Sequence, residues 1–175
     1  YQAVELDGLI YAVAGMTGSF PNEQPLSHIY IYDPLADAWH QGAEIPANRR
    51  RGSAGVVVYQ DKIYVLGGIQ QGHISGWVPW FDAYDPHTNT WTTLADAPRE
   101  RDHFHALLAN GKLYAAGGRK TGFSGVFGAT IPEVDVYDFA SSTWATLPNN
   151  LPNPQAGASV ALIGNELILV GGENS

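Results

Sequence analysis

The sequence contains no cysteine, and only 15% of its residues are charged. The lack of cysteine excludes disulfide bonds and thiolate metal sites. No run of 18 apolar residues occurs, so the sequence predicts no membrane-spanning segment. Basic residues are also few: nine lysines and arginines stand against 17 acidic residues, a formal charge of −8. This balance argues against a nucleic-acid partner, which needs a basic surface.

Segments with the 3.6-residue apolar period of a helix are absent as well. The 175 residues do contain 20 glycines, 11 prolines and 45% hydrophobic residues. This composition is typical of many short strands joined by turns, and it supplies enough apolar side chains for a core.

An apolar run that ends in glycine recurs along the chain. The closing glycines lie 53, 50 and 54 residues apart, at Gly15, Gly68, Gly118 and Gly172. A second signal, Tyr-Asp followed six residues later by Trp, runs in phase with the first and starts at Tyr32, Tyr84 and Tyr137. Self-similarity at a period near 50 indicates a repeat protein.

One repeat, residues 51–93, shows how the unit folds. Four apolar segments, 55–59, 63–68, 80–85 and 90–94, are separated by turn residues and by a variable loop at 69–79. Other repeats place Asp7-Gly8 and Asn110-Gly111 at the first turn, a strong signal for a two-residue hairpin. The unit is therefore predicted to be a four-stranded antiparallel meander, with strands A, B, C and D. Four-stranded units at this period predict blades around an axis, which is a β-propeller.

The doubled glycine, the Tyr-Asp pair and the following Trp make the sequence resemble the kelch-repeat family. The resemblance covers nearly the whole chain and implies an all-β, kelch-type β-propeller. The departures are Ala14 for the first glycine and Phe139 where proline usually follows Tyr-Asp. We expect about three and a half blades, at 1–44, 51–95, 101–147 and a half blade at 157–175, within a ring of six or seven. Unprotected sheet edges would otherwise remain, so we expect further blades of the same propeller or self-association.

Charge is sorted between the two ends of the predicted blades. The D–A segments and B–C loops share one face, and seven of the nine cations fall there: Arg49, Arg50, Arg51, Arg99, Arg101, Arg119 and Lys120. Arg51 and Arg101 occupy the same position in two repeats. In kelch domains that bind acidic peptides, arginines at this position commonly contact the ligand. The resemblance therefore implies ligand contact by Arg51 and Arg101. The alternative is that they pair with Asp102, Glu100 or backbone carbonyls between blades.

The same face carries aromatic residues in long, glycine-flanked loops. Trp77, Trp80 and Phe123 suit stacking against a sugar or an apolar anchor. The predicted ligand contacts are therefore Arg51, Arg101, Arg49, Arg99, Trp77, Trp80, Arg119 and Phe123. Trp80 could instead begin strand C and belong to the core.

The segment "RDHFH" raises the question of a metal or catalytic site. His103 and His105 lie two apart, so they face one side of a strand and form a weak candidate metal pair beside Asp102. No third ligand is evident, and we expect no cofactor. Asp102 and His103 are also the weak candidates for catalysis. The cysteine that copper-radical oxidases of this fold use is absent, as are the motifs G-x-S-x-G and H-E-x-x-H.

The sequence thus favours a binding module that recognises a protein, peptide or carbohydrate, preferably acidic, on the face of the D–A segments and B–C loops. The alternative is a sugar-modifying enzyme, epimerase-, mutarotase- or oxidase-like, with an acid–base or metal site near Arg101, Asp102 and His103.

Overall fold

The structure, a computed structural model, describes residues 2–174 other than 123, 124, 126 and 127. Three four-stranded antiparallel sheets and one two-stranded sheet follow one another along the chain. The first blade contains β1 (Gln2–Leu6), β2 (Leu9–Val13), β5 (His28–Asp33) and β6 (Ala38–Glu44). The second contains β7 (Gly55–Tyr59), β8 (Lys62–Leu66), β11 (Phe81–Asp85) and β12 (Thr90–Thr93). The third contains β13 (Ala106–Ala109), β14 (Lys112–Ala115), β17 (Asp135–Asp138) and β18 (Thr143–Thr146), and the last sheet pairs β19 (Ser159–Ile163) with β20 (Glu166–Val170).

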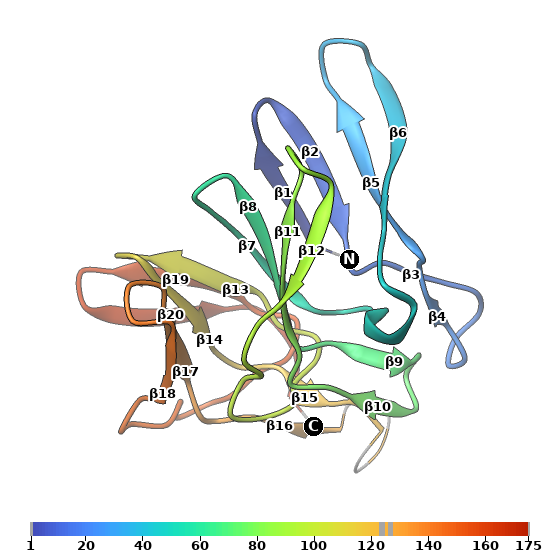
Figure 1. The fold of residues 1–175 in the computed structure, drawn as a ribbon. Coiled ribbons are helices and arrows are strands. Elements are labelled where there is room, and N and C mark those ends of the chain that lie inside the picture. Colours follow the sequence, from blue (N-terminus) through green and yellow to red (C-terminus); the bar gives the residue numbers. More distant parts are fainter. Residues whose placement is uncertain (1, 123–124, 126–127, 175) are drawn as a thin grey trace.

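The sheets fan out as an arc of blades (Figure 1). The first strands of successive blades, β1, β7, β13 and β19, contact one another along the inner side of this arc. Within the described residues the only helical element is a short 3₁₀ turn at Ala47–Arg49. The prediction of an all-β fold made of four-stranded antiparallel blades is confirmed.

The Tyr-Asp and Trp signal is explained by the turn between the third and fourth strands. In the third blade, Tyr137 and Trp144 lie directly opposite each other, with ring centroids 5.1 Å apart. The next residue, Asp138, accepts hydrogen bonds from the backbone N–H groups of Ala140 and Ser141, which fixes the turn. Asp33 and Asp85 hold the equivalent turns of the other two blades in the same way.

The glycine pairs allow the next blade to approach closely. A Cβ on Gly67 would lie 2.5 Å from the carbonyl oxygen of Arg101, and one on Gly117 would lie 2.5 Å from that of Gln155. The following glycine N–H uses the same contact, since Gly68 donates to the Arg101 carbonyl over 2.8 Å. Both glycines of the second blade also have positive φ, +65° and +110°. The first glycine is therefore required by the packing of the next blade. The second is required by its own D–A segment, because a Cβ on Gly68 would lie 2.7 Å from the carbonyl oxygen of Gly52.

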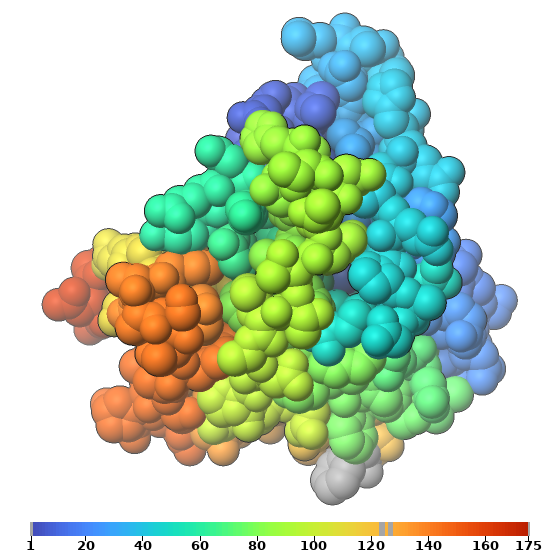
Figure 2. All heavy atoms as spheres, viewed as in Figure 1, coloured from blue at the N-terminus to red at the C-terminus, as the bar shows by residue number. Residues whose placement is uncertain are grey.

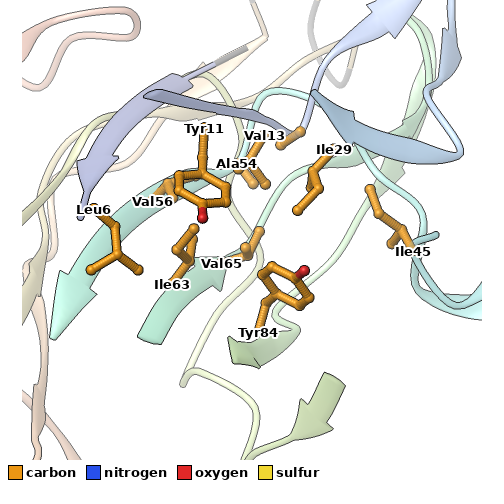
Figure 3. Close-up of a cluster of buried hydrophobic side chains, with 11 residues drawn as sticks. Leu6, Tyr11, Val13, Ile29, Ile45, Ala54, Val56, Ile63, Val65 and Tyr84 are labelled. Carbon is orange, nitrogen blue, oxygen red and sulfur yellow. The ribbon is translucent and has the colours of Figure 1, made fainter. Parts of the chain in front are cut away.

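The core lies between the blades. Its first cluster joins blades one and two and contains Leu6, Tyr11, Val13, Ile29, Ile45, Ala54, Val56, Ile63, Val65 and Tyr84 (Figure 3). A second cluster around Phe81, Phe104 and Leu113 joins blades two and three. Phe139, which stands where proline is usual, stacks on Tyr59 of the second blade at 4.1 Å. Each interface thus depends on side chains from two neighbouring repeats.

The B–C loops are more regular than the sequence predicts, because each folds as a two-stranded hairpin. These are β3 (Met16–Thr17) with β4 (Gln24–Pro25), β9 (Ile69–Gln71) with β10 (Ser75–Trp77), and β15 (Arg119–Lys120) with β16 (Ala129–Thr130). We call the three together the hairpin crown. In the space-filling view, the blue β3–β4 and green β9–β10 hairpins form the lower right edge of the molecule (Figure 2).

Candidate functional site

The hairpin crown and the D–A segments lie at one end of the blades, as the meander predicts. Neighbouring hairpins are tied together. The N–H of His73 donates to the carbonyl of Pro21 over 2.9 Å, and the Trp77 indole N–H donates to the carbonyl of Thr121 over 2.9 Å. Gly72 and Gly122 fit against the backbone of the adjacent hairpin, where a Cβ would meet carbonyl oxygens at 2.3 and 2.2 Å. The crown is therefore one braced surface.

Arg51 lies beneath this surface and is buried, with 3% of the residue exposed. Its guanidinium contacts the Asp82 carboxylate at 2.6 Å and donates to the carbonyls of Gly67 and Val65 at 3.0 and 2.9 Å. Burial lowers the pKa of Arg51 to about 10, with the Asp82 carboxylate opposing that shift, so the side chain stays cationic at neutral pH. All of these partners belong to its own blade.

Arg101 repeats this arrangement in the third blade, with 1% of the residue exposed. Its guanidinium contacts Asp135 at 2.6 Å and donates to the carbonyl of Gly117 at 2.7 Å. Burial again lowers its pKa to about 10, opposed by Asp135. The two arginines predicted to contact a ligand are thus buried inside the propeller. The sequence left open that they pair internally, but the partners it named, Asp102 and Glu100, were wrong: the carboxylates are Asp82 and Asp135 of the third strand of the same blade.

Arg49 and Arg99 approach the same two aspartates from nearer the surface. Arg49 Nε donates to Asp82 over 3.0 Å, and Arg99 Nε lies 3.2 Å from Asp135. Their side chains are 14% and 23% exposed. The Arg49 guanidinium lies 4.5 Å from the ring centroid of Trp80, so this half-buried tryptophan packs under a cation at the start of strand C.

The remaining cations of this end also have carboxylate partners. Arg119 is 2% exposed and contacts Glu173, and Lys120 contacts Glu100 at 2.9 Å while its Nζ lies 5.1 Å from the Trp77 ring centroid. Arg50 contacts Glu44 at 2.6 Å. The seven cations counted on this face therefore form ion pairs within the protein and do not make a free basic patch.

Apolar side chains are exposed at the tips of two hairpins. Phe20 of the first hairpin is 60% exposed and Ile74 of the second is 47% exposed. The Phe20 ring lies 5.1 Å from the His73 ring, so the first tip leans on the second. Phe123 lies outside the described residues. Neither Phe20 nor Ile74 was singled out from the sequence, although the glycine-flanked loop that carries Ile74 was.

The segments at the starts of β1, β7, β13 and β19 together line one small cavity on the inner side of the arc. It has a volume of about 120 Å³ and is lined by Gln2, Ser53, Ala54, His103, Phe104, His105 and Gly157. His103 Nδ1 is hydrogen-bonded to the buried carboxylate of Asp102, which also accepts the backbone N–H of Thr121 over 3.0 Å. Ser53 Oγ lies 3.4 Å from His103 Nε2. Sequence reasoning found Asp102 and His103 but missed Ser53, although Ser53 lies 50 residues before His103, at the same position of its repeat.

Arg101, Asp102 and His103 do not form one site. Arg101 is directed to Asp135, whereas Asp102 and His103 are directed to each other and to Thr121. His103 and His105 both line the cavity, yet no group of three or more His, Asp or Glu side chains with metal-binding geometry occurs among the described residues. In the part of the chain that the structure describes, no helix is long and apolar enough to cross a membrane.

The fourth repeat has a different counterpart of Arg101 than the sequence alone suggests. By sequence, Ala156 is aligned with Arg101. The isolated bridges, however, pair Gly52 with Ile69, Asp102 with Arg119, and Ala156 with Glu173. Ala156 therefore corresponds to Asp102, and Gln155 occupies the arginine position. The fourth repeat consequently has a neutral side chain where the second and third have a buried cation.

Comparisons with known proteins agree with this architecture. Residues 2–172 match the family described as the KLHDC2/KLHL20/DRC7 Kelch-repeats domain. Kelch-like protein terF of Aspergillus terreus is 34% identical over 96% of this chain and 37% of its own length. Alpha-scruin of Limulus polyphemus is 28% identical over 97% of this chain and 18% of its own. The solved structure of YjhT superposes with a TM-score of 0.81 at 18% identity, covering 97% of this chain and 58% of that one.

The chain thus spans less than two fifths of the length of these two curated relatives. By name, these relatives are a kelch-like protein and a scruin. Taken with the doubled glycines, the Tyr–Trp pairs and the four-stranded blades, the match over residues 2–172 shows that the chain belongs to the kelch-repeat family.

Proposed function

We propose that this kelch-repeat chain binds a protein partner through the hairpin crown, with Phe20 and Ile74 as the central apolar contacts. The observation that carries the proposal is the exposure of these two side chains, 60% and 47%, at the tips of adjacent hairpins that are braced against each other. Apolar anchors on a rigid surface give binding energy with little loss of conformational entropy.

The surroundings of the two tips suit a protein partner. Interfaces commonly combine a few apolar anchors with a polar rim. In this proposal the rim is formed by half-buried side chains of the same end of the blades that the sequence predicted as ligand contacts: Arg49, Arg99, Trp77 and Trp80. In this proposal Arg51, Arg101 and Arg119 act from below, because their guanidinium groups are already engaged by Asp82, Asp135 and Glu173.

The preference for an acidic ligand then depends on Arg49 and Arg99. Each shares its aspartate with a buried arginine and contacts a second, more exposed carboxylate, Asp96 at 3.8 Å for Arg49 and Glu133 at 3.0 Å for Arg99. A carboxylate of the partner would therefore meet two cations and two anions, and it would have to replace Asp96 or Glu133 beside the arginine. We propose a modest acidic preference that weakens with salt, because partly exposed charges are screened.

The experiment selects peptides from a displayed random library on the chain and measures their affinity for variants by calorimetric titration. Phe20→Ser and Ile74→Ser should each weaken binding by about tenfold, which equals about 1.4 kcal/mol. Leu35→Ser is the matched control, because Leu35 is fully exposed at a C–D turn at the other end of the blades. Equal affinity of wild type and the Phe20→Ser/Ile74→Ser double variant would refute the proposal.

The same titrations separate the other partners that the sequence predicts. Acidic and neutral peptides of equal length, measured at two salt concentrations, test the role of Arg49 and Arg99. Acidic and neutral oligosaccharides test carbohydrate binding, and light scattering of the free chain tests self-association. Sugar binding that survives the Phe20→Ser/Ile74→Ser double variant would replace the protein-binding proposal.

A further inference from the structure

The position held by Ser53, His103 and Gly157 is unusual in the repeat. All three have positive φ, +53°, +50° and +67°. They are linked across the blades, since the N–H of His103 donates to the carbonyl of Ser53 over 2.9 Å and that of Gly157 donates to the carbonyl of His103 over 2.7 Å. Glycine suits such a conformation at no steric cost, and histidine is among the residues that adopt it more often than most. The shared backbone conformation gives Ser53 and His103 the same orientation in adjacent repeats, so their side chains meet.

Side chains at this position enter the cavity. A Cβ built on Gly157 meets no atom within 4 Å, so the position faces open space. Ser53 and His103, one repeat apart, both line the cavity of about 120 Å³. Their 3.4 Å Oγ–Nε2 contact follows from the side-by-side packing of the first strands of blades two and three.

A buried carboxylate orients the imidazole. Asp102 is fully buried and bonds to His103 Nδ1, and Nε2 faces Ser53. In the tautomer whose Nδ1–H donates to Asp102, Nε2 is the acceptor for the Ser53 hydroxyl. The carboxylate is itself held by the N–H and the hydroxyl of Thr121, and Thr121 Oγ1 receives a hydrogen bond from Arg119 Nε over 2.8 Å. Carboxylate, imidazole and hydroxyl thus stand in the order that activates a serine as a nucleophile.

We propose that Ser53, His103 and Asp102 form a hydrolytic site for small esters. Ser53 Oγ attacks the ester carbonyl carbon while His103 Nε2 takes the hydroxyl proton. The bond from carbon to the alcohol oxygen breaks, and the alcohol leaves with that proton. Water, deprotonated by the same imidazole, then attacks the acyl carbon. The bond from this carbon to Ser53 Oγ breaks, the imidazole returns the proton to Oγ, and the carboxylic acid leaves. Asp102 is a positioning residue for the imidazole.

The cavity limits the substrate and supplies a donor for the oxyanion. The cavity is small, about 120 Å³, and Ala54 and Phe104 give it an apolar side, so we expect a short acyl group to fit better than a long one. Gln2 lines the same cavity. Its Oε1 accepts the N–H of Val56 over 2.6 Å, which leaves its amide N–H₂ as the group that donates to the developing oxyanion.

The first test is covalent labelling of the chain with a fluorophosphonate, followed by peptide mass mapping. Labelling of Ser53 is expected, and it should be lost in Ser53→Ala and in His103→Ala. Ser141→Ala and His87→Ala are the matched controls, because both side chains are exposed at C–D turns away from the cavity. Wild-type chain that is not labelled at Ser53 would overturn the proposal.

The second test is hydrolysis of p-nitrophenyl acetate and p-nitrophenyl octanoate. Acetate should be the better substrate, and Ser53→Ala should lower kcat by at least about 100-fold. Asp102→Asn should lower kcat with little change in KM, a split that a merely structural role would not produce. Melting curves accompany each variant, and Ser53→Ala keeps the test decisive if Asp102→Asn fails to fold. Hydrolysis unchanged in Ser53→Ala would also overturn the proposal.

Discussion

The two ends of blades two and three use ion pairs differently. At the end that carries the hairpin crown, Arg51 and Arg101 contact buried aspartates. At the opposite end, Lys62 and Lys112 contact Asp85 and Asp138 near solvent. The arginine pairs measure 2.6 Å and both partners are at most 3% exposed. The lysine pairs measure 3.4 and 3.1 Å, and the lysine side chains are 45% and 43% exposed. The same repeat thus uses ion pairs as internal ties at one end and as surface contacts at the other.

This difference explains where recognition can occur. Seven cations lie at the end that carries the hairpin crown. The two at the repeated position, Arg51 and Arg101, are already paired with Asp82 and Asp135. What remains exposed there is the hairpin crown with its apolar tips. The buried ties hold the D–A segment under the crown, and the crown carries the contacts we propose for a partner.

The largest effect on stability is expected for Arg101→Ala. The change leaves Asp135 buried with only Arg99 and Thr146 beside it and leaves the carbonyl of Gly117 without its guanidinium donor. Removing one member of a buried pair costs about 3–5 kcal/mol of unfolding free energy. Urea denaturation followed by tryptophan fluorescence measures it. A loss no larger than that of a surface substitution would contradict the role of Arg101 as a tie.

Arg101→Lys should have an intermediate effect on the free energy of unfolding. Lysine keeps the charge beside Asp135 but cannot bond the carboxylate and the carbonyls of Gly117 and Glu133 together. An unsatisfied buried acceptor costs about 1–3 kcal/mol. The same denaturation experiment measures the effect, with Arg50→Lys as the control at a more exposed pair. Stability equal to wild type would show that charge alone is sufficient.

The smallest effect is expected for Lys112→Ala, which should leave the denaturation midpoint within experimental scatter. The measurable consequence is instead a change in the pKa of Asp138. The hydrogen bond from Lys112 and those from the turn N–H groups hold the pKa of Asp138 below its ordinary value of 3.8. A lowered carboxyl pKa contributes stability above pH 3.8 that is lost as the pH falls through the folded pKa. Carboxyl NMR titration should therefore show a higher pKa for Asp138 in the variant, and an unchanged value would contradict the contact.

Much of the fold could be predicted because its signals repeat in phase. Tyr137 and Trp144 are opposite partners on adjacent strands, so their spacing is fixed by the turn between them. In the second and third blades, the first glycine of each doublet is fixed by the close approach of the next blade and the second by the D–A segment of its own blade. Because these requirements are local, the same residues recur at the same positions of the repeats, and this recurrence can be recognised in the sequence.

The arginine environment was harder to predict, because its partners lie on another strand. Asp82 and Asp135 each precede a repeated tyrosine by two residues, so they share its side of the strand. Both repeats that carry the arginine also carry this aspartate, whereas the first repeat has Tyr30 there. This joint occurrence of arginine and aspartate could have been used to predict that the two side chains pair. The hairpins of the crown left no such trace, because their pairs are only two or three residues long and their loops differ in length.

Amide hydrogen exchange of the chain with and without a selected peptide tests the central claim most directly. The account predicts slower exchange in the hairpins at 16–25 and 69–77 on binding, with unchanged exchange in the C–D turns at 34–37, 86–89 and 139–142. Protection confined to those turns, or none in the two hairpins under saturating peptide, would contradict recognition at the hairpin crown.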